Sequence, residues 1–538
     1  MWNALVWAAA LGLASPSAAP DASAIRVGTI RIESNDVFTP DEASRGWFYR
    51  AANSIHLPTR TSFLRKQLLF QEGDVLNIAQ LAETERNLRA LPFIKSASVT
   101  ASAPHDGVSD VLVVTQDAWT TEPGGSFGSK GGRTTYSFEF QETDLLGTGR
   151  SLSFSYDKGT ERTTRSVVFQ DPYVFRPFWR SKVLLADNSD GRQRQFEIAR
   201  PFYSFRAPWS ADALVSRLAE EDKIYRDGRT FSAFQHERHE TLVSYGRALE
   251  SGEFRAQRLT GGIDFMHDAF NVLPGKPDGV IPGRRDFRYV FATYELIENA
   301  YETLNYVNRD SRYEDFNLAP RLFARVGVSP VALGAPVNSA FVEGQWSGGI
   351  RIDDDAFAQT DVDAQSRFAS GPENTIVSLF AGYVRRFRLS RMPQTFVARI
   401  QVDRGWRLDQ DVQFEASGAT GLRGYRLHAM TGNKRILVNV EQRFFSEREY
   451  LQLFSPGAVV FVDAGEAAPP GTPLAFSRLK ADAGVGLRIA IARAGGNNIL
   501  RIDVAYPFQA DARGRRGPLV SFSSSQAFSF RRTSALGD

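Results

Sequence analysis

The stretch Gly421-Leu422-Arg423-Gly424-Tyr425 lies late in a long series of segments in which apolar and polar residues alternate. Such alternation indicates β-strands, because successive side chains of a strand point to opposite faces. The segments begin near Tyr136 and continue to about Phe528, with turn residues between them. Gly421 and Gly424 would let the backbone turn tightly between two strands. The sequence therefore predicts a large all-β domain with this pentapeptide in one of its later connections.

The composition limits the class of protein. The 538 residues include 40 Phe, 16 Tyr, 8 Trp and 44 Gly, which fits a barrel with an apolar exterior and a wet interior. A large soluble sandwich or propeller would fit these numbers as well. Cysteine is absent, which excludes disulfides, thiolate nucleophiles and cysteine metal sites. The 64 Lys and Arg against 61 Asp and Glu are spread along the chain, so we expect no nucleic-acid partner.

The N-terminus is typical of a secretory signal peptide, which we place at residues 1–24. Ala4 to Leu13 is apolar, and a small-residue cleavage site follows at Ala22-Ser23-Ala24. The apolar run is shorter than the roughly 20 residues that a membrane-spanning helix needs. Met1-Trp2-Asn3 lacks the usual basic residue, and an ordinary N-terminal helix is the alternative.

Residues 25–119 predict a small α+β domain. Leu81, Leu88 and Leu91 favour one face of a helix that ends before Pro92. Alternation predicts strands before and after this helix, at residues 26–32, 96–99 and 110–115, with a turn at Asp106-Gly107. The segment 39–68, which contains Trp47-Phe48-Tyr49, has no role that the sequence assigns.

A boundary follows at Glu122-Pro123-Gly124-Gly125, from which we predict a linker at 120–133, a barrel at 134–530 and a tail at 531–538. If each strand with its loop takes about 25 residues, the barrel holds about sixteen antiparallel strands.

Several motifs, in order along the chain, resemble those of the BamA/TamA superfamily of outer-membrane assembly and translocation factors. The pentapeptide resembles the loop-tip motif of that family. Four further features are also similar to those of the family. They are the first barrel hairpin (144–150), an Asp-Pro-Tyr that ends a strand (171–173), a strand with the pattern FxDxG (461–465) and the last pair of strands (483–488 and 501–508). In 25–119, Glu72-Gly73-Asp74, the segment 87–93 and the terminal Val-rich strand resemble one POTRA module.

The strand Phe461-Val462-Asp463-Ala464-Gly465 carries the second half of the candidate site. Alternation puts Phe461, Asp463 and Gly465 on one face, and a carboxylate facing lipid would be costly, so Asp463 should face the lumen. The resemblance implies that Arg423 folds into the lumen and pairs with Asp463, while Tyr425 packs beside it. Arginine suits this role because its planar fork binds a carboxylate with two hydrogen bonds. The alternative is an exposed Arg423 and a hydrated Asp463.

The C-terminal strand, residues 522–528, resembles the family's insertion signal in its spaced aromatic residues. It departs from that signal in two ways. Ser525 stands where glycine is usual, and the chain continues to Asp538 beyond the aromatic residue that is usually terminal.

No catalytic motif occurs: the sequence lacks HExxH, GxSxG and Walker-type patterns, so we expect no enzyme activity, cofactor or metal. Asp353-Asp354-Asp355 is interpreted as a solvated turn, with calcium binding as a minor alternative. The resemblance implies an outer-membrane insertase or translocase with its POTRA-like domain in the periplasm. Its partners would be unfolded outer-membrane or exported polypeptides, the lipid bilayer and a periplasmic accessory protein. A seam between the first strand (136–140) and the last (519–528) would admit them. The alternatives are a passive pore or two-partner secretion channel, and an adhesin.

Overall fold

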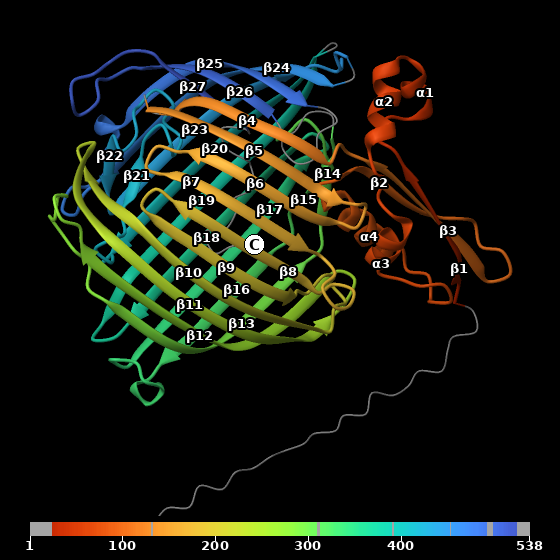
Figure 1. Cartoon of the computed structure of the whole chain (residues 1–538), viewed down its shortest axis with the longest axis horizontal. Coiled ribbons are helices and arrows are strands. Elements are labelled where there is room, and N and C mark those ends of the chain that lie inside the picture. Colours follow the sequence, from red (N-terminus) through yellow and green to blue (C-terminus); the bar gives the residue numbers. More distant parts are fainter. Residues whose placement is uncertain are drawn as a thin grey trace, which may run out of the picture.

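The computed structural model describes residues 24–130, 133–308, 312–389, 392–451, 453–491 and 499–524. These residues form a small N-terminal domain beside one end of a large β-barrel (Figure 1). The predicted signal peptide up to Ser23, the end of the C-terminal strand and the tail 531–538 lie outside the described residues. In the described part, no helix has both the length and the apolar character needed to cross a membrane.

The N-terminal domain is a three-stranded sheet with helices on it, in the order β1-β3-β2, where β1 runs parallel to β3 and β2 antiparallel. Its core joins Leu81 and Leu88 of the long helix to Val111 and Val113 of the central strand. The predicted helix and all three predicted strands are present. The elements are β1 (Arg26–Asn35), α1 (Pro40–Ser44), α2 (Trp47–Ile55), α3 (Thr61–Gln67), α4 (Ile78–Ala90), β2 (Ile94–Ala101) and β3 (Val108–Asp117).

Local chemistry sets the ends of these elements. The Asn77 side chain accepts a hydrogen bond from the Gln80 amide at the start of α4, and α4 ends at Ala90, close to the predicted stop. Asp106 and Gly107 both have positive φ, at 49° and 75°, as a two-residue turn between the bridged His105 and Val108 requires.

The segment 39–68 folds into α1, α2 and α3. A capping box between Thr39 and Glu42 starts α1. Phe63 and Leu64 of α3 belong to the main core of the domain. The buried Ala52 of α2 packs instead in a separate small cluster.

Twenty strands of the described part close into one barrel, so the expected count of about sixteen is wrong. Many connections are tight hairpins of a few residues, so the average strand-plus-loop unit is shorter than we assumed. The strands up to the long middle loops are β4 (Thr121–Lys130), β5 (Arg133–Leu145), β6 (Arg150–Lys158), β7 (Thr163–Asp171), β8 (Arg180–Asn188), β9 (Gly191–Arg200), β10 (Trp209–Arg226), β11 (Arg229–Ser251), β12 (Arg255–Val272) and β13 (Arg285–Glu298). The others are β16 (Arg321–Ser329), β17 (Ser339–Asp353), β18 (Ala356–Phe368), β19 (Pro372–Leu389), β20 (Met392–Trp406), β23 (Lys434–Phe445), β24 (Phe454–Ala468), β25 (Lys480–Ile491), β26 (Ile499–Pro507) and β27 (Leu519–Ser524).

The predicted linker at 120–133 is wrong, because residues 121–130 form the first barrel strand. β4 pairs with β5 from Thr121↔Glu142 to Lys130↔Arg133 and lies between β27 and β5 in the closed order. Pro123 and the glycines of this segment suggested a loop, but a proline lacks only one donor and the pairing persists around it. The seam of the barrel therefore lies between β4 and β27, and the segment 136–140 belongs to the second strand.

The smaller elements lie in the connections between barrel strands. One two-stranded sheet joins β13 to β16, and another lies in the loop between β20 and β23. These elements are β14 (Tyr301–Leu304), β15 (Glu314–Asn317), η1 (Val331–Leu333), β21 (Phe414–Ala416), β22 (Met430–Gly432) and η2 (Phe476–Arg478).

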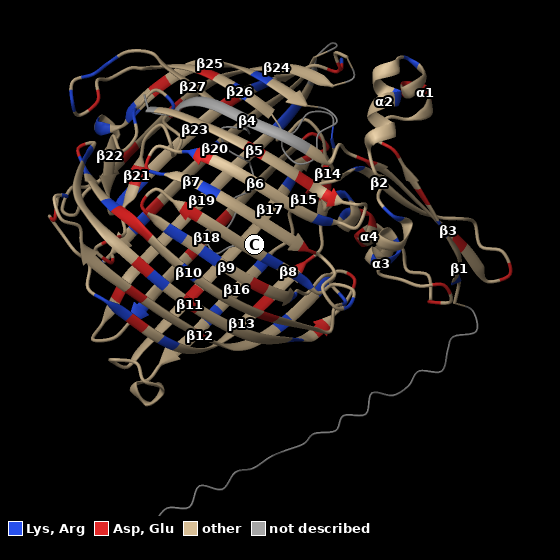
Figure 2. Cartoon of the chain, in the orientation of Figure 1, with Lys and Arg blue, Asp and Glu red and all other residues tan. Residues whose placement is uncertain are grey.

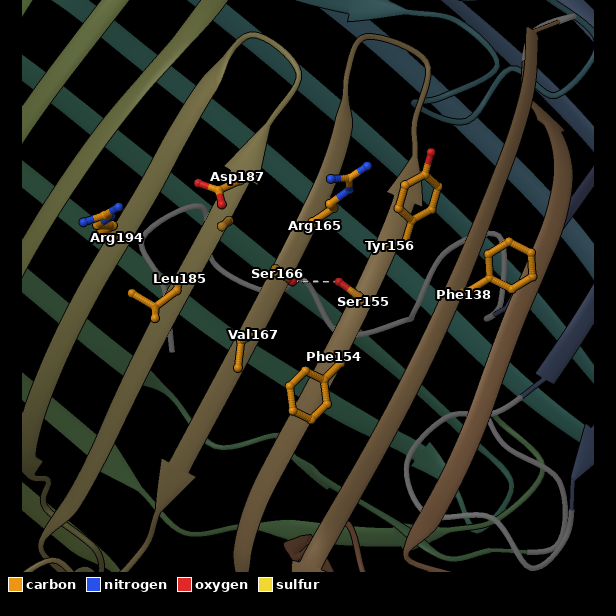
Figure 3. A pocket seen from close by; sticks show the side chains of 11 residues that line it. Phe138, Phe154, Ser155, Tyr156, Arg165, Ser166, Val167, Leu185, Asp187 and Arg194 are labelled. Atoms are coloured by element: carbon orange, nitrogen blue, oxygen red, sulfur yellow. Dashed lines mark hydrogen bonds between the residues drawn. The ribbon is translucent and has the colours of Figure 1, made fainter.

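Figure 2 shows charged residues along many of the barrel strands. Many of these charged side chains are buried, whereas large apolar side chains such as Val460, Val462 and Leu487 are exposed. A shallow groove of about 730 Å³ on β5 to β9 illustrates the outer face (Figure 3). Phe154, Val167 and Leu185 form its apolar part, and Arg165 and Asp187 lie nearer the hairpins. Along these strands, apolar side chains on the outer face give way to charged ones near the hairpins. Such a change is expected where an apolar outer band of a barrel ends.

Candidate functional site in the barrel lumen

The loop between β20 and β23, residues 407–433, folds back into the barrel and is called the lumenal loop below. Its β21 and β22 pair antiparallel, from Phe414↔Gly432 to Ala416↔Met430. The pentapeptide lies in the tip between them. The carbonyl oxygen of Ser417 accepts hydrogen bonds from the amides of Thr420, Gly421 and Leu422, which makes the tip compact.

Both glycines of the pentapeptide lie where a side chain would not fit. Gly421 has φ 129°, and a Cβ there would lie 3.0 Å from Nη2 of Arg399. A Cβ on Gly424 would lie 2.6 Å from Cβ of Asp482 on β25. The tip therefore lies directly against the barrel wall, and the glycines permit both its turn and its close approach.

Leu422 and Tyr425 anchor the tip by packing. Leu422 is fully buried in a cluster with Ala416 and Leu437. Gly465 leaves room for Leu437 in this cluster, since a Cβ on Gly465 would lie 2.7 Å from Cδ2 of Leu437. The Tyr425 hydroxyl lies 3.0 Å from Oε1 of Gln509 and 3.1 Å from the carbonyl oxygens of Ala481 and Gln509. Its single O–H donates to one of these acceptors at a time.

Arg423 lies against Asp463, as the resemblance implied. Its Nε and Nη2 donate to the two carboxylate oxygens at 2.7 and 2.8 Å, and its Nη1 donates to Oε1 of Glu441 at 2.6 Å. The guanidinium carbon lies 3.4 Å from the centre of the Phe461 ring, which adds a cation–π contact. A third carboxylate, that of Asp503 on β26, lies 3.8 Å from Nη1. We call Arg423, Asp463, Glu441 and Asp503 the Arg423 cluster.

Burial and charge act in opposite directions on Arg423, which is 6% exposed. Burial alone would lower the pKa of Arg423, but Glu441 and Asp463 outweigh it, and the pKa is raised above its ordinary value. The guanidinium therefore stays charged at every pH at which the protein folds. Its chemistry is that of a permanent electrostatic fastening between the loop tip and the wall, with no proton to transfer.

The wall supports the Arg423 cluster with further polar contacts that sequence reasoning missed. Asn439 of β23 donates to Oδ1 of Asp463 and to the carbonyl of Gly421, both at 2.6 Å. Arg443 donates from Nε to Oε2 of Glu441 at 2.7 Å, and Arg488 donates to Asp503 at 2.6 Å. Alternation along β23 places residues 439, 441 and 443 on one face, so this pattern could have indicated a polar inner row.

A second fastening of the lumenal loop was not predicted. His428 stacks on Tyr225 of β10, with ring centres 3.5 Å apart. Its Nδ1 lies 2.8 Å from Oε2 of Glu415, and its Nε2 lies 3.2 Å from Oε1 of Glu161 in the β6–β7 hairpin. Burial lowers the pKa of His428, but the two carboxylates raise it further, to about 9. A lone histidine carries no sequence signal for such a partner set.

The start of the lumenal loop is held by arginines of other strands. Arg285 of β13 donates to both carboxylate oxygens of Asp411 at 2.8 Å, and Arg367 of β18 donates to Asp409 at 2.7 Å. Together with the Arg423 cluster and His428, these contacts attach the loop to several sides of the lumen.

The run Asp353-Asp354-Asp355 lies at the turn between β17 and β18, where each carboxylate has an arginine partner. The partners are Arg385, Arg351 and Arg386, in that order. Such cationic neighbours compete with a metal ion, and among the described residues no group of three carboxylate or histidine side chains is arranged so that it could hold one.

No protein-family model and no curated protein matches the sequence. Solved structures similar to this chain include BamA from Haemophilus ducreyi lacking POTRA domains 1–3, at 14% identity and a TM-score of 0.42, covering 93% of this chain and 84% of that one. CdiB from Acinetobacter baumannii is similar at 11% identity and a TM-score of 0.48, over 93% of this chain and 73% of that one. CdiB from Escherichia coli is similar at 13% identity and a TM-score of 0.41, over 92% and 75% of the two chains.

Proposed function

We propose that the chain is an outer-membrane insertase or translocase of the BamA/TamA type, which assists the insertion or translocation of β-barrel or other exported polypeptides. The observation that carries this proposal is the loop tip held inside a closed barrel by Arg423 and Asp463, the arrangement that the motif resemblance implies. The N-terminal domain is a POTRA-like unit that lies in the periplasm, at the barrel end where β4 begins.

The faces of the barrel support its placement in a membrane. On β24, Val460 and Val462 point outward and are exposed, whereas Phe461 and Asp463 point inward and are buried. Burial of such an apolar outer face in lipid is favourable, and the charged inner face requires a polar lumen.

The closing strands support a lateral route for client strands. β4 contains Pro123, Gly124, Gly125 and Gly128, and the described part of β27 has the sequence LVSFSS. Proline removes a donor, and glycine weakens a strand, so these two strands pair less firmly than the Val-rich strands elsewhere. A client strand could add to either edge by main-chain hydrogen bonding. This process needs no cofactor or nucleotide, because strand pairing and burial in lipid drive it.

A disulfide across the seam tests this mechanism. The chain has no native cysteine, so single pairs can be introduced cleanly. Val520→Cys on β27 should be combined in turn with cysteine at positions 123, 125 and 127 of β4. The matched control is Phe138→Cys with Tyr156→Cys, which face each other on β5 and β6, inside the continuous sheet. We expect the seam disulfide, but not the control, to abolish activity until it is reduced.

Depletion of the protein in its host separates this function from a passive pore or two-partner secretion channel. Loss of outer-membrane barrel proteins, with secretion unchanged, supports an insertase. Loss of one secreted protein with normal barrel levels, together with full activity of the seam-locked protein, would show that the chain is a secretion channel instead.

A further inference from the structure

Helix α2 presents an apolar face to its surroundings. Trp47, Phe48 and Ile55 are 74%, 48% and 72% exposed. At 3.6 residues per turn these three positions lie within about 100° of one another, with Ala51 between them. Tyr49 and Asn53 lie on the opposite side of the helix and are half-buried, and Ala52, next to Phe48, is buried in the domain. The face is therefore a continuous apolar stripe, unusual for a domain surrounded by water.

The helix is attached to the rim of the barrel. The Tyr49 hydroxyl donates to the carbonyl oxygen of Leu451, in the turn between β23 and β24, at 3.2 Å. Tyr49 also packs in a small cluster with Trp119 and Leu453, which lie just before β4 and β24 begin. Figure 1 shows α2 near the end of β24, apart from α3 and α4. This rim is the end of the barrel that faces the N-terminal domain.

Exposed apolar residues also occur in the barrel turn that contacts α2 and on the outer face of the strand that follows it. Leu451 in the turn is 71% exposed, and Tyr450 beside it is 55% exposed. Phe454 follows at the base of β24, on the same outward face as Val460 and Val462. Exposed apolar side chains thus run from the wall through the turn to the helix that is bonded to it.

The residue types favour a lipid surface as the occupant. Tryptophan and phenylalanine are favoured where a membrane meets water, and an apolar face on a short helix can lie in that boundary. Arg45 and Arg50 are exposed next to the stripe, where they can contact lipid phosphates. A second copy of the chain or a client polypeptide would not require the stripe to adjoin the wall.

We propose that α2 is an interfacial membrane anchor, in which Trp47, Phe48 and Ile55 enter the headgroup–acyl boundary of the leaflet next to the N-terminal domain. The anchor holds that domain at the barrel rim beside the start of β4. The proposal rests on the membrane placement of the barrel given under the proposed function.

Single cysteines in the full chain test the anchor. Phe48→Cys and Ile55→Cys are labelled with an environment-sensitive fluorophore, after a check that each variant keeps the heat-modifiable gel mobility of a folded barrel. His105→Cys, in the exposed connection between β2 and β3 of the same domain, is the control away from the stripe. Val462→Cys on the outer wall reports whether the barrel itself is in lipid. The proteins are reconstituted in phosphatidylethanolamine–phosphatidylglycerol vesicles with and without spin-labelled lipid.

We expect blue-shifted emission and quenching by spin-labelled lipid at positions 48, 55 and 462, and weak quenching at 105. Quenching at 462 but not at 48 and 55 overturns the anchor and leaves the proposed function intact. No quenching at any of these positions overturns both. Protection of positions 48 and 55 that depends on protein concentration, with crosslinks between chains, overturns the anchor in favour of a second copy.

Discussion

Replacement of Arg423 by alanine should release the lumenal loop from the wall without unfolding the barrel. The change leaves the buried Asp463 with Asn439 as its remaining side-chain donor, while Glu441 keeps Arg443. Removal of one partner of a buried ion pair costs roughly 3–5 kcal/mol, because the other charge stays buried without compensation. The barrel strands keep their own hydrogen bonds, so this cost falls on the closed position of the loop.

Thiol labelling measures that cost. Ala416 is fully buried between the loop and the wall, and Ala416→Cys changes the volume little. The new thiol should react with a maleimide only when the loop leaves the wall. A cost of about 3 kcal/mol corresponds to a roughly hundredfold increase in the open population and hence in the labelling rate.

A double-mutant cycle provides the control. Asp463→Ala should also speed labelling, and the double variant should be no faster than Arg423→Ala alone, because the unpaired carboxylate is then gone. Additive effects of the two substitutions, or an unchanged rate in Arg423→Ala, would show that this contact does not hold the loop.

Three further outcomes are expected. The pKa of His428 is raised from 6.5 to about 9, so its contacts stabilise the closed loop fully below about pH 6.5 and lose this effect as the pH rises through about 9. The labelling rate of Cys at position 416, corrected for the reactivity of a free thiol, should therefore increase over this pH range. The same increase should be absent when His428→Gln is added. Gly424→Ala would place its Cβ 2.6 Å from Cβ of Asp482 on the wall and should destabilise the closed loop by about 1–3 kcal/mol, seen as faster labelling, whereas Gly283→Ala, which has open space, should change nothing. Thr59→Val removes the hydroxyl that donates to the buried Asp144 at 2.7 Å and should weaken docking of the N-terminal domain on the barrel by about 1–3 kcal/mol. The Arg60 amide, which donates to the carbonyl oxygen of Gly147, should then exchange its hydrogen faster. Equal exchange rates in the variant and the unchanged protein would contradict this role.

Sequence patterns predicted the three strands and helix α4 of the N-terminal domain because these depend on local chemistry, whereas α1, α2 and α3 were not predicted. Alternation, the leucine face of α4 and the Asp106-Gly107 turn each act within a few residues. The linker and the strand count depended on the closure of the barrel, which no local pattern encodes. Pro123 and its neighbouring glycines disfavour a strand by themselves, and only the edges of β5 and β27 on either side of them make a strand there.

The candidate site shows the same division. Gly421, Arg423 and Asp463 could be identified because a motif and a face of one strand single them out. Glu441, Asn439 and His428 could not, because their roles come from strands and hairpins that only the closed barrel brings together. A polar residue in an alternating strand indicates the lumen but does not name its partner.

The lumenal loop is held to the wall by the ion pairs of Arg423 as well as by apolar packing, and this choice indicates the role of the Arg423 cluster. A buried ion pair contributes little net stability, because the desolvation of both groups offsets their attraction, and apolar residues of similar size often stabilise more. The loop tip already buries Leu422 and Tyr425, so further apolar packing was available for that purpose. Arg423 instead meets three carboxylates on β23, β24 and β26 at fixed angles, which specifies one position of the tip. We infer that the Arg423 cluster defines where the loop rests rather than how strongly the barrel holds together. The labelling cycle distinguishes these roles, because a positional contact changes the open population of the loop and leaves the thermal unfolding of the barrel unchanged.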